Sequence, residues 1–275
     1  MADRADGKVL FITGAARGIG AATAKEAAAR GHRLALADID GAGAQQLAAA
    51  LGGNALGLAL DVRDPAQWQR ALDQAWAHFG TVDVLINNAG VVHTGYVLDV
   101  PFERHRHTVE VNYLGNIAGV QAALPRFIAQ GRGHLITICS LTAYMPFPSL
   151  ASYAGTKHAL RGFHHTLAWE YRKQPLHFTI VYPPAVETPM LQQEAQDDSA
   201  AAAFGEPPIS PEVMARHIVD AVASKPREVT VPAFQGWLLR AFGAFVCIMR
   251  IVLADLEKHG RKNLAARKAL QRDPT

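Results

Sequence analysis

The 275-residue chain lacks several features that mark other protein classes. It has two cysteines, Cys139 and Cys247, too few for a disulfide framework or a thiolate metal site. The twelve histidines show no metal-ligating spacing, and the formal net charge of +3 gives no support to nucleic-acid binding. The first seven residues lack the basic region and long apolar run of a secretory signal. We therefore expect a cytoplasmic protein with no metal site that binds no nucleic acid.

Short apolar runs alternate with helical patterns along most of the chain. The runs show no period-two alternation, which indicates strands buried on both faces of a parallel sheet. Strands are predicted at residues 8–13, 33–37, 56–60, 82–86, 133–139, 176–182 and 228–231, and helices near 18–30, 41–51, 65–79, 101–130, 151–174 and 211–224. The fold class is therefore α/β, and ligands of such sheets bind at the C-terminal ends of the strands.

The first strand leads directly into a glycine-rich turn. Gly14, Arg17, Gly18, Ile19 and Gly20 lie between this strand and an alanine-rich helix. Glycines here allow a tight turn and a close approach of phosphate, and the free amides of the helix start attract a diphosphate. The motif favours a dinucleotide site, although a plain strand-to-helix turn has the same pattern.

Asp38 ends the second strand, eighteen residues after Gly20. A carboxylate there can accept both ribose hydroxyls and would repel a 2′-phosphate, so it favours NAD over NADP. Arg17 favours the opposite choice, because a guanidinium in the turn could reach that phosphate, and NADP stays open. Alternatively, Asp38 caps the helix at 41–51.

Two later strand ends and one helix carry further candidates. The third strand ends in Asp61 and Val62, where Asp61 either contacts the adenine edge or is a turn residue. The fourth leads into Asn87, Asn88, Ala89 and Gly90, whose amides can tie neighbouring strands while the backbone passes close to a flat ligand. Asn112, in the middle of the long helix at 101–130, either faces the site or is exposed.

Tyr153 and Lys157 lie four residues apart at the start of a predicted helix and project from one face. A cation beside a phenol lowers its pKa, so that it can exchange a proton with an alcohol or ketone. Ser140 stands thirteen residues upstream of Tyr153, at the end of the fifth strand. Taken alone, the Tyr-Lys pair is more typical of an ordinary amphipathic helix.

The motifs together resemble the signature set of the short-chain dehydrogenase/reductase family, from about residue 8 to 190. The set comprises Thr13-Gly14-x3-Gly18-x-Gly20, Asn87-Asn88-Ala89-Gly90, Asn112, Ser140 and Tyr153-x3-Lys157. The resemblance implies a single-domain, Rossmann-type, doubly wound sheet of about seven parallel strands. It also implies a homodimer or homotetramer formed through the helices at 101–130 and 151–174.

The same resemblance assigns roles to the candidate residues. Tyr153 is the general acid/base, and Ser140 binds the substrate oxygen. Lys157 holds the nicotinamide ribose and lowers the pKa of Tyr153, while Asn112 positions a water. After the sixth strand, Pro183, Val186 and Thr188 border the nicotinamide. Pro184 replaces the glycine usual in the family, so the backbone there must be arranged differently or be stiffer.

Two segments lie beyond these motifs. Residues 192–210 are polar, acidic and alanine-rich, as expected for a lid or a plain surface loop. We divide the chain into a catalytic domain at 1–235 and a helical extension at 236–275. The extension repeats apolar residues at helical spacing, at Trp237, Leu238, Ala241, Phe242, Phe245, Ile248, Met249, Val252 and Leu256.

The extension has three possible uses. Arg240 and Arg250 interrupt its apolar run, which argues against a membrane-spanning helix. It could cap an apolar pocket, pack on a second subunit, or lie on a membrane surface beside Arg261, Lys262, Arg267 and Lys268. In the last case the protein would be peripheral to a membrane.

The predicted function is hydride transfer between NAD(H) and a secondary alcohol or ketone. A bulky, lipophilic substrate of a steroid, retinoid or aryl kind is indicated by the apolar extension together with Tyr144, Met145, Phe147 and Met190. The alternatives are an NADP-dependent reductase of small carbonyl compounds and a non-catalytic, dinucleotide-sensing protein.

Overall fold

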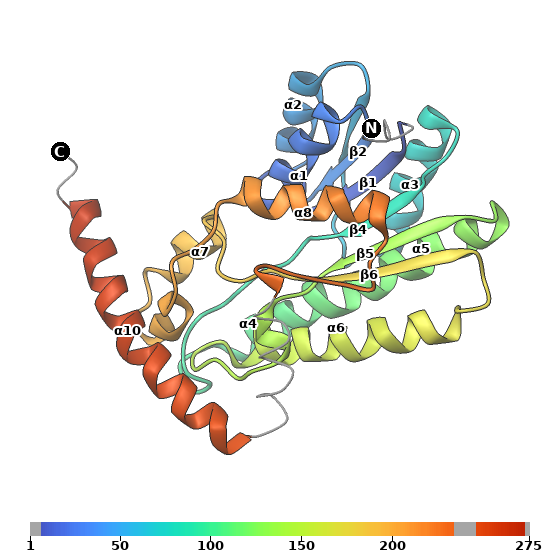
Figure 1. Cartoon of the computed structure of the whole chain (residues 1–275). Coiled ribbons are helices and arrows are strands. Elements are labelled where there is room, and N and C mark those ends of the chain that lie inside the picture. The colour runs from blue at the N-terminus through green and yellow to red at the C-terminus, as the bar shows by residue number, and fades with distance from the viewer. Residues whose placement is uncertain (1–6, 234–245, 273–275) are drawn as a thin grey trace.

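All seven predicted strands pair in parallel in one sheet (Figure 1). The computed structural model describes residues 7–233 and 246–272. The strands are β1 (Val9–Thr13), β2 (Arg33–Asp38), β3 (Ala55–Ala59), β4 (Val84–Asn87), β5 (Gly133–Ile138), β6 (Leu176–Tyr182) and β7 (Glu228–Thr230). Their order is β3-β2-β1-β4-β5-β6-β7, so the order reverses between β1 and β4. A ligand crevice is expected at that reversal, outside the C-terminal strand ends.

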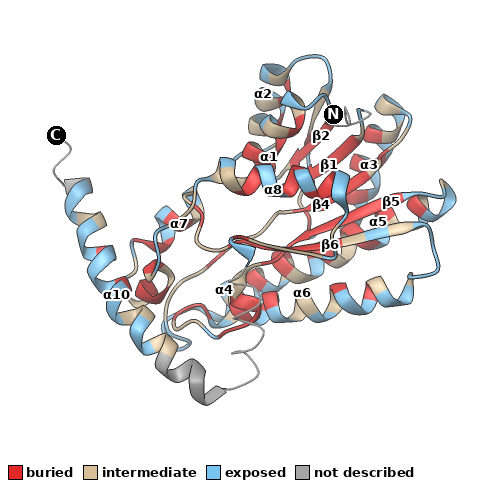
Figure 2. Ribbon diagram, in the orientation of Figure 1, coloured by how far each residue is buried: buried red, intermediate tan, exposed pale blue. Residues whose placement is uncertain are grey.

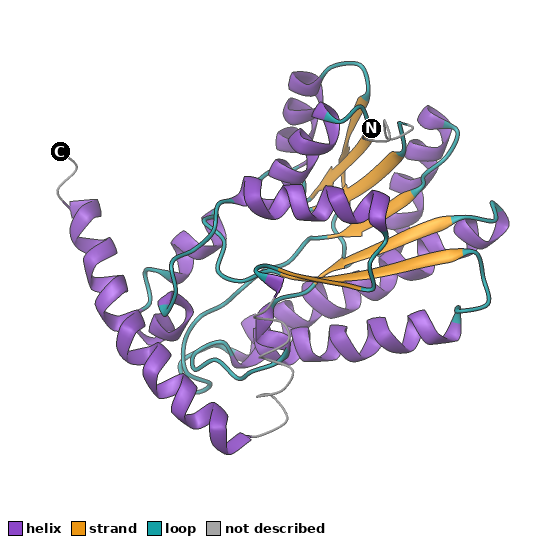
Figure 3. Ribbon diagram, viewed as in Figure 1, coloured by secondary structure: helices purple, strands orange, loops and turns teal. Residues whose placement is uncertain are grey.

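Helices cover both faces of the sheet (Figure 3). Helices α1 (Gly18–Ala29), α2 (Gly41–Leu51) and α8 (Pro211–Ser224) pack on one face. Helices α3 (Pro65–Phe79), α5 (Gly115–Ala129) and α6 (Ala151–Glu170) pack on the other. The central strands β1, β2, β4 and β5 are almost entirely buried (Figure 2), which explains their continuous apolar sequence. The predicted doubly wound, single-domain fold is confirmed.

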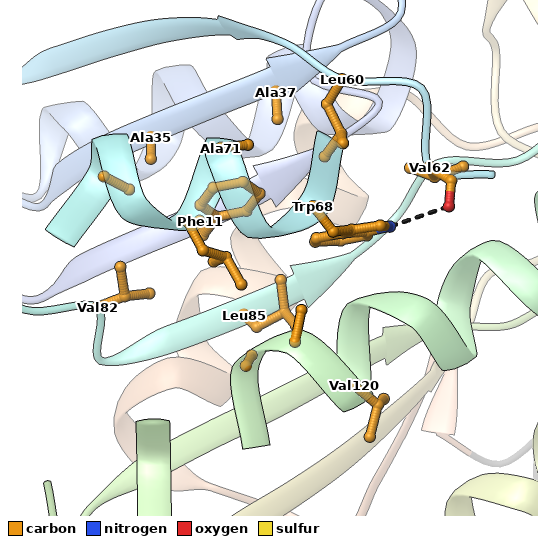
Figure 4. Close-up of a cluster of buried hydrophobic side chains, with 14 of the residues drawn as sticks. Phe11, Ala35, Ala37, Leu60, Val62, Trp68, Ala71, Val82, Leu85 and Val120 are labelled. Atoms are coloured by element: carbon orange, nitrogen blue, oxygen red, sulfur yellow. Dashed lines mark hydrogen bonds between the residues drawn. The ribbon is translucent and has the colours of Figure 1, made fainter. Parts of the chain in front are cut away.

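The core beneath α3 also holds a strand end in place (Figure 4). Trp68 is fully buried and stacks on Phe11, with ring centroids 5.9 Å apart. Its indole Nε1 donates a hydrogen bond of 2.9 Å to the carbonyl oxygen of Val62. The loop after β3 is therefore anchored to the core, because a buried indole N–H needs an acceptor and this loop supplies it.

The helix predicted at 101–130 is interrupted, which corrects the prediction of one continuous helix. It consists of α4 (Phe102–Val109), a π-helical turn (Glu110–Leu114) and α5. The π turn contains Asn112, whose side chain forms two hydrogen bonds with the backbone of Val91. Its Oδ1 accepts from the Val91 backbone N (2.8 Å), and its Nδ2 donates to the Val91 carbonyl oxygen (2.9 Å). These two bonds to a distant loop offset the poorer backbone geometry of the π turn, which local periodicity could not reveal.

The segment after β6 is folded and partly buried rather than a plain loop. It forms α7 (Pro189–Glu194) and a 3₁₀ helix, η3 (Asp198–Phe204), in which Ala200, Ala201 and Phe204 are buried. The last helix, α10 (Val246–Arg272), lies beside α7 and η3 with much of its surface exposed (Figure 2).

Part of the predicted extension lies outside the described residues, namely Trp237, Leu238, Arg240, Ala241, Phe242 and Phe245. The side chains of Ile248, Met249 and Arg250 lie outside them as well. Within residues 7–233 and 246–272, no helix is long and apolar enough to span a bilayer.

Candidate active site

The glycine turn and α1 form one side of a cleft, and the segment after β6 and the start of α8 form the other side. Gly14 and Gly18 have φ angles of +63° and +58°, which favour glycine. A Cβ at Gly20 would lie 2.0 Å from the carbonyl oxygen of Gly14, so only glycine fits where α1 meets the turn. The cleft has a volume of about 470 Å³, and Arg17 and Gly18 line it together with Glu187 and Pro211.

Asp38 joins the end of β2 to this turn. Its Oδ2 accepts from the backbone N of Ala16 at 2.9 Å, and its Oδ1 accepts from the backbone N of Asp40 at 3.0 Å. The alternative that Asp38 caps α2 is wrong, because Asp40 is the cap and accepts from the backbone N of Gly43 at 2.9 Å. The carboxylate of Asp38 is thus held at a strand end beside the glycine turn.

Asp61 forms an ion pair with Arg63, with 2.6 Å between Oδ2 and Nη2, and accepts from the backbone N of Arg63 at 3.0 Å. Hydrogen bonding to Arg63 lowers the pKa of Asp61. The expected turn role of Asp61 is therefore present in the structure. Its contact with an adenine edge stays a prediction, as does cofactor contact by the buried Val62.

Asn88 ties β4 to β1, as predicted from the paired amides. Its Nδ2 donates to the carbonyls of Thr13 (2.8 Å) and Gly14 (3.1 Å). The backbone N atoms of Asn88 and Ala89 donate to the Thr13 hydroxyl at 3.0 and 3.1 Å. Because these bonds hold the two strand ends on either side of the crevice, Thr13 has a larger role than the sequence indicated.

The structure brings Tyr153, Lys157, Ser140 and Asn112 together at the ends of β4 and β5. The Lys157 side chain is buried, and its Nζ donates to the carbonyl of Ile138 (3.1 Å) and lies 5.4 Å from the Tyr153 ring centroid. Ser140 hydrogen-bonds to Tyr153. A Cβ at Gly90 would lie 3.4 Å from Asn112 Oδ1 and 3.9 Å from Lys157 Nζ. Asn112 therefore faces the site, which spacing alone left open.

The pKa of Tyr153 is shifted in the opposite direction from the expected one. Burial raises the pKa of Tyr153, the Glu194 carboxylate raises it further, and the hydrogen bond from Ser140 lowers it. Burial also lowers the pKa of Lys157. The expectation of a lowered Tyr153 pKa is therefore corrected, because burial has the largest effect on this pKa.

Sequence reasoning missed Glu194. This residue ends α7, is 8% exposed, and acts electrostatically on Tyr153. Burial raises the pKa of Glu194 to about 7. No local pattern distinguishes it from the other polar residues of its segment, because its burial depends on how α7 folds back on the sheet.

The residues after β6 border the same crevice. The carbonyl of Pro183 accepts from the backbone N of Leu141 at 3.1 Å, which joins the end of β6 to the Ser140 segment. Val186 is buried and bridges to Ile209. Thr188 caps α7 and lies against the glycine turn, with its Cγ2 3.4 Å from the position of a Cβ on Gly18.

Comparisons with known proteins agree with this geometry. A family profile described as short chain dehydrogenase matches residues 8–199. A putative oxidoreductase, SadH, of Mycobacterium tuberculosis is 34% identical over 82% of this chain and 86% of its own length. A 2,5-dichloro-2,5-cyclohexadiene-1,4-diol dehydrogenase, LinX, of Sphingobium indicum is 36% identical over 72% of this chain and 80% of its own.

A solved structure shows the same architecture. A short chain dehydrogenase/reductase from Burkholderia phymatum, in complex with NAD, superposes with a TM-score of 0.79 at 26% identity, covering 86% of this chain and 93% of that one. The fold, the matching motifs and these relatives lead to one conclusion: the chain belongs to the short-chain dehydrogenase family and is an oxidoreductase.

Proposed function

We propose that this protein transfers a hydride between NAD(H) and a bulky, lipophilic secondary alcohol or its ketone, with Tyr153 as general acid/base. The observation that carries the proposal is the convergence of Ser140, Tyr153 and Lys157 at the C-terminal end of β5, on the same sheet edge as the glycine turn. An alcohol and a dinucleotide could meet there.

The residues present suit a dinucleotide. Only glycine fits at position 20, and α1 presents its free N-terminal amides. Asp38 is held beside the glycine turn, and we assign to it the hydroxyls of the adenosine ribose. A bound nicotinamide would supply the hydride donor or acceptor. The preference for NAD rests on the charge of Asp38, because a carboxylate within a few ångströms of a 2′-phosphate would repel it. The Burkholderia phymatum relative was solved in complex with NAD, which is consistent with this choice.

Proton transfer falls to Tyr153. In ketone reduction its hydroxyl gives its proton to the carbonyl oxygen while the carbonyl carbon receives a hydride, and alcohol oxidation reverses both transfers. Ser140 steadies the charge on that oxygen, and the raised pKa of Tyr153 keeps the phenol protonated at neutral pH. A protonated phenol is the form that reduction requires.

The substrate class rests on the apolar groups near Ser140. Tyr144 and Met145 are buried directly after the short 3₁₀ turn at Leu141–Ala143. The LinX relative is named for a ring diol, so a ring-bearing secondary alcohol suits both observations. A panel of alcohols with NAD tests this, and a preference for small polar substrates such as sugars would contradict it.

The test of the mechanism is Tyr153→Phe. It should abolish turnover and leave NADH binding intact, measured by steady-state kinetics and fluorescence titration. Tyr171→Phe, just past the far end of α6, removes a hydroxyl outside the site and should keep wild-type activity. Retained turnover in Tyr153→Phe would defeat the mechanism, and NADH binding without turnover by the wild type would favour a dinucleotide sensor.

The test of cofactor choice is Asp38→Ala. The NADP-to-NAD ratio of kcat/KM should rise by about tenfold or more, because one like-charge repulsion is removed. Asp40→Ala, which removes the α2 cap, is the matched control and should leave the ratio unchanged. An unchanged ratio in Asp38→Ala, or equal use of both cofactors by the wild type, would refute the preference.

We also infer a homo-oligomer formed through α4, α5 and α6. Phe102 at the start of α4 is 76% exposed and Trp169 at the end of α6 is 69% exposed, and apolar side chains of this size are favourable at subunit contacts. Sedimentation that finds only monomers at micromolar concentration would contradict this inference.

A further inference from the structure

The C-terminal helix α10 packs on the segment after β6 at backbone distance. A Cβ at Gly260 would lie 1.8 Å from the carbonyl oxygen of Ala201, and one at Gly205 would lie 2.5 Å from Leu256 Cδ2. Leu264 is 2% exposed and buried in a cluster with Leu191 and Phe204. The two segments therefore pack without space for even a methyl group at these glycines.

From this helix, Arg267 reaches Glu187 with two parallel contacts. Its Nη1 donates to Oε2 at 2.7 Å, and its Nη2 donates to Oε1. The guanidinium also lies over the Phe204 ring, 6.0 Å from the centroid. Gln192 donates a further hydrogen bond to Glu187, and the pairing with Arg267 lowers the pKa of that carboxyl. The fork fixes Glu187 as an ionised, paired carboxylate.

Glu187 lines the cleft that begins at the glycine turn, together with Arg17 and Gly18. A diphosphate entering that cleft would meet the Glu187 carboxylate on its wall. An unpaired carboxylate there would repel the diphosphate, whereas a carboxylate paired with a guanidinium has no net charge to oppose it. The charge of Arg267 therefore bears on anion binding in the cleft.

We propose that Arg267 is a positioning residue of the dinucleotide site: by neutralising and holding Glu187 it makes the cleft wall acceptable to an anionic diphosphate, so α10 completes the cofactor site. This inference rests on the proposed function, since it takes the cleft as the place of the diphosphate. It gives the C-terminal extension a role that needs neither a membrane nor a second subunit.

The experiment compares binding of NADH and of ADP, which carries a diphosphate without nicotinamide, across a set of full-length variants. Arg267→Gln should weaken both by about five- to tenfold at low salt. Glu187→Gln with Arg267→Gln should restore both to within about twofold, because the repelling charge is gone. Lys268→Gln is the matched control, since Lys268 pairs with Asp198 outside the cleft lining, and should bind as the wild type does.

The dependence of binding on salt distinguishes an electrostatic effect of Arg267 from a structural one. The loss in Arg267→Gln should shrink at 1 M salt, where the screening length is about 3 Å. A double variant that binds as weakly as Arg267→Gln, or a loss that salt leaves unchanged, would show a merely structural ion pair and overturn the proposal.

Glu187→Gln alone keeps Arg267 and provides a test that does not depend on how Arg267→Gln folds. It should bind ADP at least as tightly as the wild type, and weaker binding would overturn the proposal. The proposed function fails differently, through absent turnover in the wild type, whereas the ADP titrations report on Arg267 whether or not hydride transfer occurs.

Discussion

Gly260→Ala tests directly how α10 is docked. In a helix interior, alanine is favoured over glycine by about 0.8 to 1 kcal/mol, so a substitution with no steric conflict should stabilise the protein. At Gly260 the new Cβ would lie 1.8 Å from the carbonyl oxygen and 2.7 Å from the carbonyl carbon of Ala201. Real contacts of this kind exceed 3 Å, so α10 must move by more than 1 Å or lose its contacts.

The expected magnitude follows from these two opposing effects. Overpacking costs about 1 to 3 kcal/mol, which exceeds the helix gain, and a net loss of 1 kcal/mol lowers Tm by about 2 to 4 °C for a chain of this size. Gly162→Ala is the control, because Gly162 lies in α6 and a Cβ there meets no atom within 4 Å. The control should gain stability where Gly260→Ala loses it.

Thermal unfolding and amide hydrogen exchange measure the outcome. In Gly260→Ala, amides of residues 254–272 and 189–205 should exchange faster, since both segments share the contact. NADH affinity should fall as well, because Arg267 moves with the helix. If Gly260→Ala stabilises the protein as Gly162→Ala does, with unchanged exchange in these segments, the docking argument is wrong.

Three further predictions concern buried polar groups. The pKa of Glu194, about 7 against 4.5 in the unfolded chain, means that the native state loses stability as pH rises from 4.5 to 7. Glu194→Gln should therefore exceed the wild type by up to about 3 kcal/mol at pH 8 and match it near pH 4 in urea titrations. Burial lowers the pKa of both His134 and His164 to about 3. Between pH 6.5 and 3 these histidines are protonated in the unfolded chain and neutral in the native state, so the native state loses stability as pH falls through this range. The slope of unfolding free energy against pH near 4.5 should include about two protons from these histidines, and a slope below one proton would contradict it. Asn112→Ala leaves both backbone groups of Val91 without their partner and should cost about 2 to 4 kcal/mol in urea unfolding; a loss below 1 kcal/mol would mean that the π turn is held by other contacts.

The sequence predicted correctly those helices whose ends are set by residues next to them in the chain. The helices Gly41–Leu51, Pro65–Phe79 and Pro211–Ser224 have the predicted bounds, because a polar cap starts each of them and a glycine or left-handed residue follows each. The glycine turn and the parallel direction of the strands also follow from residues close in the chain and from the apolar runs typical of parallel sheets.

The interrupted helix at Asn112 was beyond such rules. Its π turn depends on hydrogen bonds to Val91, twenty-one residues earlier. The spacing of apolar residues along the helix does not indicate a hydrogen-bond partner so far away in the chain. The same holds for Asp38 and Asp40, either of which could cap α2 by spacing, until the position of the Ala16 amide decides between them.

By itself, then, the sequence determined the sheet, the glycine turn and the residues that could exchange a proton. Only the tertiary structure decided their charge states, because burial of Tyr153, Lys157 and Glu194 depends on how α6 and α7 pack on the sheet ends. It also decided that Arg267 meets Glu187, eighty residues away, since ion pairs between distant segments form only when folding brings both side chains to one surface.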